Sequence, residues 1–100
     1  MVVGVLRLTV YLPENHSLKG KRAVLRKLKA QVANEFNVSI AEAEDHDLWQ
    51  KAMVGVAHVG GDTGRVDGEL RAVVRFVEAM GIVELGEQTI EILHYGDDRP

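Results

Sequence analysis

The sequence contains no cysteine. This absence excludes disulfide bonds, thiol catalysis and thiolate metal sites, and it agrees with a reducing compartment. The sequence also lacks an apolar run long enough to cross a membrane. Arg7 interrupts the short apolar run at the N-terminus, which has no basic start of the kind a signal peptide needs. We therefore expect a cytoplasmic protein with no membrane partner.

The chain also has no excess of positive charge and few aromatic residues. The formal net charge is −3, which excludes a general polycation that binds nucleic acid indiscriminately. Aromatic residues make up only 5% of the chain, and the RNP1 pattern of an RRM is absent. No pair of histidines has the spacing of an HExxH motif, and we expect neither a bound metal nor a cofactor.

The basic residues that are present gather in one stretch. Residues 15–29 hold six of the twelve Lys and Arg residues and no carboxylate. Ser17 is a good helix N-cap, and the spacing of leucines predicts a helix over residues 18–36. Its apolar stripe consists of Leu18, Leu25, Leu28, Val32 and Phe36. A second stripe at the same spacing consists of Lys19, Arg22, Arg26 and Lys29.

Periodicity along the rest of the chain predicts one α+β domain over residues 1–100. We expect strands over residues 2–12, 37–43, 48–59 and 82–95, and a second helix over residues 65–80. The order βαββαβ, with right-handed crossovers, predicts a ferredoxin-like sandwich. Its antiparallel four-stranded sheet has the order 4-1-3-2 in chain numbering, with both helices on one face. A bend or bulge in the last strand is expected at Gly86.

This topology places the start of the first helix beside the turn over residues 44–49. One interpretation is structural: Lys19, Lys21 and Arg22 pair with Glu44, Asp45 and Asp47. A second interpretation is an anion site, in which helix N–H groups and the basic side chains bind phosphate. Gly20 would then allow a ligand to approach the backbone closely.

A third interpretation of the same edge is catalysis or metal binding by two histidines and two carboxylates. These residues are His16, His46, Asp45 and Asp47. His58 and His94 lie on predicted strands, where we expect them to be packed or at the surface. Trp49 is expected to pack beneath the turn, with base stacking beside Tyr11 as the alternative.

The face of the sheet opposite the helices is expected to be open and partly apolar. Residues that would lie there are Val3, Val5, Tyr11, Met53, Ala57 and Val59. An uncovered apolar face of this kind suggests a partner or a second copy of the chain.

Four segments resemble the YlxP-like family of small bacterial proteins, a family of unknown function. They are residues 3–8, 16–22, 36–42 and 47–52. The resemblance implies a ferredoxin-like fold and no established reaction. It also implies that the gene often lies beside genes for translation initiation and for ribosome-binding factor A. That position suggests a role near the small ribosomal subunit or its RNA.

Our leading hypothesis is a non-enzymatic domain that contacts RNA or a ribosomal particle through the first helix and its N-terminal edge. The predicted site consists of His16, Ser17, Lys19, Lys21, Arg22, Arg26, Lys29, Asp47, Trp49 and Gln50. The alternatives are a homo-oligomeric or small-anion-binding module on the open sheet face, and an enzyme with an acid–base or metal site near His16 and Asp47.

Overall fold

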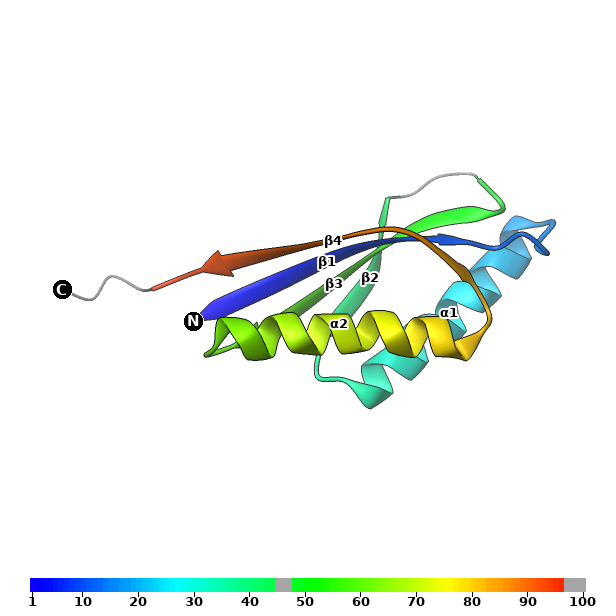
Figure 1. Cartoon of the computed structure of the whole chain (residues 1–100). Coiled ribbons are helices and arrows are strands. Elements are labelled where there is room, and N and C mark those ends of the chain that lie inside the picture. The colour runs from blue at the N-terminus through cyan, green and yellow to red at the C-terminus, as the bar shows by residue number, and fades with distance from the viewer. Residues whose placement is uncertain (45–47, 97–100) are drawn as a thin grey trace.

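A computed structural model describes residues 1–44 and 48–96, except the side chain of Glu44. Four strands and two helices follow one another in the order βαββαβ that the sequence predicts (Figure 1). The elements are β1 (Val2–Tyr11), α1 (Leu18–Glu35), β2 (Ser39–Glu44), β3 (Lys51–Gly60), α2 (Thr63–Met80) and β4 (Glu84–His94).

The sheet is antiparallel and has the order β2-β3-β1-β4, which confirms the predicted order read from the other edge. Both helices lie on the same face, below the sheet in Figure 1. α2 packs against β1, β3 and β4, whereas α1 packs against β2 and α2. α1 therefore covers one edge of the sheet and leaves its outer side to solvent.

The core lies between the sheet and the helices, and strand parity selects its residues. On β1, Leu6, Leu8 and Val10 are buried, and their neighbours on the other parity point away from the helices. β3 contributes Ala52, Val54 and Val56. The helices contribute Leu25, Leu28 and Val32, from the apolar stripe predicted for the first helix, and Val66, Leu70, Val73 and Val77, which recur at helical spacing along α2.

Local signals in the sequence also set the helix ends. The hydroxyl of Ser17 accepts a hydrogen bond from the N–H of Gly20 at 2.9 Å. Asp62 caps α2 in the same way, through the N–H of Arg65 at 2.9 Å. Gly81 ends α2 with φ 69°, a left-handed conformation that a side chain disfavours. The register of β4 shifts between the partners of Leu8 and Val10, which confirms the irregularity expected at Gly86.

Several strand boundaries differ from the predictions by one to three residues, and two of the differences have a clear cause. β3 begins at Lys51 rather than at residue 48, because the carbonyls of residues 48–50 bond to the segment before α1 and to Lys21. β2 begins at Ser39 rather than at residue 37, and the carbonyl of Asn37 instead meets the ring of His58 at 2.8 Å. His58 is thus half-buried and in contact with the backbone of the segment before β2.

Gly4 offers a test of how tightly α2 packs on β1. A Cβ atom at this position would lie 2.5 Å from Val66 Cγ1 and 2.7 Å from Leu70 Cδ1, and both side chains are fully buried. We expect Gly4→Ala to lower the free energy of unfolding by about 1–3 kcal/mol, the usual effect of overpacking a core.

The matched control is Gly68→Ala on the exposed side of α2, where a Cβ atom would meet nothing within 4 Å. Alanine favours the helix there, so stability should rise by about 0.5–1 kcal/mol. Urea unfolding of both variants gives the comparison. A stability change of the same sign in both would contradict the close packing at Gly4.

Candidate functional site

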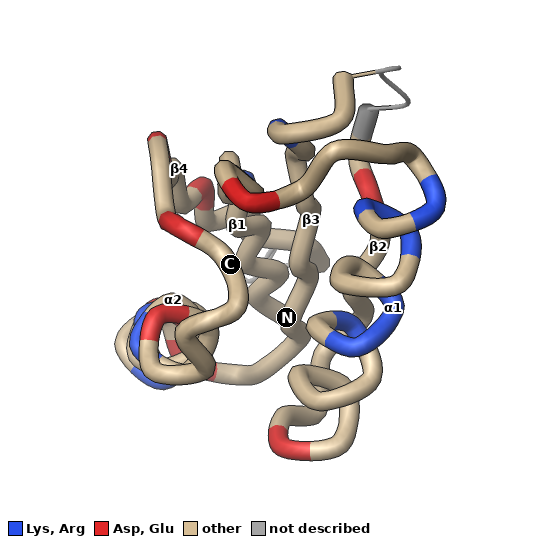
Figure 2. Tube along the Cα trace, turned by 90° about the vertical axis from the view of Figure 1, so that its right-hand side faces the viewer, with Lys and Arg blue, Asp and Glu red and all other residues tan. Residues whose placement is uncertain are grey.

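The outer side of α1 carries the basic stripe that the sequence predicts. Lys19, Arg22 and Arg26 are exposed, and Lys29 is half-buried on the same side. None of the four makes an ion pair with the residues that the structure describes. Figure 2 shows the Lys and Arg positions along α1, with carboxylates of β4 at the opposite edge of the sheet. Basic residues are thus dense along α1, and exposed carboxylates are dense along β4.

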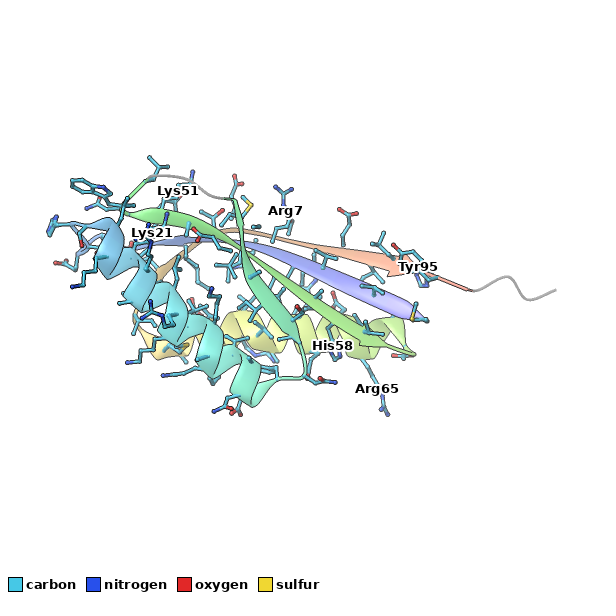
Figure 3. All side chains as sticks on the ribbon, turned by 180° about the vertical axis from the view of Figure 1, so that it is seen from behind. Arg7, Lys21, Lys51, His58, Arg65 and Tyr95 are labelled. Carbon is cyan, nitrogen blue, oxygen red and sulfur yellow. The ribbon has the colours of Figure 1, made fainter. Side chains whose placement is uncertain are left out.

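Lys21 does not belong to this exposed surface. Its side chain is buried, and its ammonium group donates to the carbonyl of Leu48 at 2.8 Å and lies 3.6 Å from Glu42 Oε2. The prediction that Lys21 contacts phosphate is thus wrong, because its charge already connects α1 to β2 and to the start of the β3 segment. Figure 3 shows Lys21 on α1, close to the end of the sheet that carries Lys51.

The start of α1 and the segment before β3 meet along a hydrogen-bonded seam, as the topology predicts. We use the term seam for the contacts between residues 12–21 and 48–50. Three consecutive carbonyls of the second segment accept hydrogen bonds from the first. Leu48 accepts from Lys21 Nζ, Trp49 accepts from Asn15 Nδ2, and Gln50 accepts from the N–H of Leu12 at 2.8 Å.

Gln50 completes the seam in the opposite direction. Its side-chain amide donates to the carbonyl of Pro13 at 3.2 Å and to that of Asn15 at 3.0 Å. Asn15 also donates to the carbonyl of Ser17 at 2.7 Å. Backbone groups that would otherwise need water are satisfied across the seam, so the two segments hold each other in place.

The space at Gly20 is occupied by the chain itself. A Cβ atom there would collide with Asn15 Oδ1, so the residue must be small for Asn15 to reach the seam. The space at Gly20 in which we expected a ligand is therefore filled by the side chain of Asn15. Ser17 also takes the N–H of Gly20, and the anion-site interpretation loses that donor as well as Lys21.

Beside the seam lies a surface hollow of about 590 Å³. We call it the Trp49 hollow. Its lining residues are Tyr11, His16, Leu48, Trp49, Gln50 and Lys51. Trp49 is 53% exposed and Leu48 is 51% exposed. Trp49 is therefore not packed away beneath the turn, contrary to our expectation. Three of the predicted site residues, His16, Trp49 and Gln50, thus line one hollow.

A second hollow, of about 400 Å³, lies on the other side of residues 12–15. It is lined by the loop before α1 and by residues 81–84. Its ionisable side chains are Glu14 and Glu84, and it contains no Lys or Arg. An anionic ligand is therefore unsuited to it.

The histidine and carboxylate site proposed at this edge cannot be assembled from the residues described. Asp45, His46 and Asp47 lie outside the described residues, as does the side chain of Glu44. The predicted pairs of Lys19, Lys21 and Arg22 with Glu44, Asp45 and Asp47 therefore lie outside them too. Within residues 1–44 and 48–96, no group of three or more His, Asp or Glu side chains is arranged to hold a metal ion. His16 lines the Trp49 hollow, and His94 is exposed at the end of β4.

Sequence reasoning missed Asn15 and Lys51. Lys51 lies directly opposite Tyr11 in the β1–β3 register, and its ammonium group is 5.9 Å from the centre of the Tyr11 ring. Pairing the end of the first strand with the start of the third would have revealed this contact. Asn15 left no comparable signal, because its partners depend on how the loop folds back.

The burial of Lys21 leads to a stability prediction. We expect Lys21→Met to lower the free energy of unfolding by about 1–3 kcal/mol, because the Leu48 carbonyl and the partly buried Glu42 lose a charged partner. Lys27→Met, at an exposed position of the same helix, should change stability by less than about 0.5 kcal/mol. Denaturant unfolding measures both, and equal stability of the two variants would contradict a structural role for Lys21.

In the part of the chain that the structure describes, neither helix is long and apolar enough to cross a bilayer. Comparison with solved structures finds the de novo designed protein Foldit4, with 14% sequence identity and a TM-score of 0.49. That match covers 93% of this chain and 96% of the designed protein, and it has no bearing on function.

A relative with a similar sequence is the uncharacterized protein YlxP of Bacillus subtilis (strain 168). It is 40% identical over 68 residues, which are 68% of this chain and 74% of the relative. The model of the family described as "Protein of unknown function (DUF503)" matches residues 3–90. The chain therefore belongs to the DUF503 family, as its resemblance to YlxP-like proteins indicates.

Proposed function

We propose that the protein is a non-enzymatic domain that binds RNA, alone or in a ribosomal particle, through the exposed basic side of α1. The observation that carries the proposal is the row formed by Lys19, Arg22 and Arg26, which are exposed and without carboxylate partners among the described residues. At about 1.5 Å of rise per residue the row spans about 10 Å, enough to contact more than one phosphate.

The second helix supports this interpretation by contrast. On α2, Arg71 donates to Asp67 at 2.8 Å, one helical turn away. Such pairs are common on a helix whose charged side serves only solubility. α1 carries more positive charge, and no carboxylate of its own precedes Glu35 at its C-terminal end. Phosphate groups of a partner would supply the missing negative charge.

The uneven distribution of charge over the molecule also favours one orientation toward RNA. Glu84, Glu87 and Glu91 are exposed on β4, the edge strand farthest from β2. A polyanion would be repelled from that edge and attracted to α1. This distribution allows a protein of net charge −3 to bind RNA in one orientation.

The proposal predicts that charge reversal on α1 weakens association with small ribosomal subunits and with RNA. In a variant with Lys19→Glu, Arg22→Glu and Arg26→Glu, we expect co-sedimentation with the subunits to be lost. Binding of fluorescent RNA should also depend less on salt, with the slope reduced by about 0.7 for each phosphate contact removed.

The matched control reverses Arg65, Arg71 and Arg75 on α2, which are exposed and give the same change in net charge. This variant should bind like the unmodified protein. Equal binding by all three proteins would refute the proposal. Equal loss in both variants would also refute it, since the effect would then come from net charge and not from α1.

The open sheet face supports a second candidate function, self-association. Val3 lies beside Val59 and Leu93, and Val5 lies beside Ala57, so three strands contribute to one partly exposed apolar patch. Val59 is 57% exposed. Arg7 projects from the same face, away from the helices (Figure 3). Pairing two such faces would remove the patch from water.

Self-association predicts a dimer with twice the 11.0 kDa mass of the chain by light scattering at micromolar concentration. Val59→Glu should convert the dimer to a monomer, because a charge would enter the patch. Leu48→Glu, at the other end of the sheet, should leave the dimer intact. A monomeric mass for the unmodified protein would exclude this candidate.

A further inference from the structure

The aromatic side chains fall into two groups, and only one of them contributes to the core. Phe36 and Phe76 pack edge to face between the helices, with ring centres 5.5 Å apart. Tyr11, Trp49 and Tyr95 are the exposed aromatic residues. Tyr11 and Trp49 line the same hollow at one end of the sheet, whereas Tyr95 lies at the other end (Figure 3).

The middle of the open sheet face offers no ring on which a base could stack. The positions there are Val5, Arg7, Met53, Gly55 and Ala57, and the register places them beside one another. Any stacking surface of this domain must therefore lie at the end of the sheet. The Trp49 hollow is lined by two exposed rings, one from β1 and one from the segment before β3.

Among the described residues, the basic side chains near this hollow lie on the side toward β3 and α1. Lys51 lies over the Tyr11 ring at 5.9 Å, and His16 is three residues before Lys19 at the start of the basic row. On the other side, the register partner of Tyr11 on β4 is Glu84. A ligand with a flat apolar part and a negative group would therefore place its negative group toward Lys51 and α1.

The backbone beneath Trp49 is held in place by the seam. Carbonyls of residues 48, 49 and 50 each accept a hydrogen bond from residues 12–21, and Gln50 donates back. A large exposed ring on a fixed backbone loses little conformational freedom on binding, which favours its use as a contact surface.

We propose that the Trp49 hollow binds an unstacked base of single-stranded RNA, with the ring of Trp49 as the stacking surface and Lys51 as the contact for the adjoining phosphate. The inference rests on the proposed function, in which α1 binds the RNA backbone. Single strands leave their bases free to stack on aromatic rings, whereas a duplex does not. The hollow would thus make the domain prefer single-stranded RNA or loops over duplex RNA.

The test uses Trp49 as its own probe, since it is the sole tryptophan of the chain. A twelve-nucleotide RNA of mixed sequence and its duplex are titrated into the full chain while tryptophan fluorescence and RNA anisotropy are recorded. We expect the single strand to quench the fluorescence and to bind more tightly than the duplex. Quenching that is absent, or equal for strand and duplex, would overturn the inference.

Three variants separate stacking from folding. Trp49→Leu removes the ring and should weaken single-strand binding by about 5- to 150-fold, the range measured for loss of one base–aromatic stack. Trp49→Phe keeps a ring and should recover part of the affinity. The matched control Tyr95→Leu, at the far end of the sheet, should bind normally. Equal affinity of Trp49→Leu and the unmodified protein would overturn the inference.

The α1 charge-reversal variant distinguishes failure of this inference from failure of the proposed function. Binding lost in that variant but unchanged in Trp49→Leu would leave the proposed function intact and remove the base-binding hollow. Binding unchanged in both would remove both proposals. Association with ribosomal subunits that resists ribonuclease but is lost in Trp49→Leu would show a protein partner in the hollow, which also overturns the inference.

Discussion

The hydrogen bonds from residues 12–21 to three consecutive carbonyls of residues 48–50 are the constraint on which the candidate site depends. They fix the start of α1 relative to the start of β3. A loop of this kind would otherwise turn its carbonyls to water, and its side chains would have no set position. Because the carbonyls point into the seam, the Trp49 side chain lies beside Tyr11 and Lys51 at the surface.

Lys21 was predicted to lie at the surface, but the structure gives it a structural role. The apolar stripe of α1 runs through Leu18 and Leu25, and position 21 falls between them at helical spacing. A lysine at that position faces the sheet, where its charge must find partners. Glu42 and the Leu48 carbonyl provide them. The gap in the stripe was visible in the sequence, but the partners were not.

The two proposals use different physical properties of the same edge. The exposed row on α1 offers positive charge outside both hollows, which suits a backbone of repeated phosphates. The Trp49 hollow offers two rings beside a cation, which suits a flat group next to a phosphate. The seam joins them, because His16 and Ser17 lead directly from the hollow into the first turn of α1. A ligand bound by both would cross the start of the helix.

The sequence alone determined the order of the elements, their buried faces, the caps at Ser17, Asp62 and Gly81, and the basic side of α1. These features follow from periodicity and from contacts a few residues apart, so the local sequence carries them. The tertiary structure decided the burial of Lys21, the hydrogen bonds of Asn15 and Gln50, and the position of Tyr11, Trp49 and Lys51 around one hollow. Those contacts join segments 27 to 40 residues apart, and their geometry exists only after the sheet has brought the two ends together.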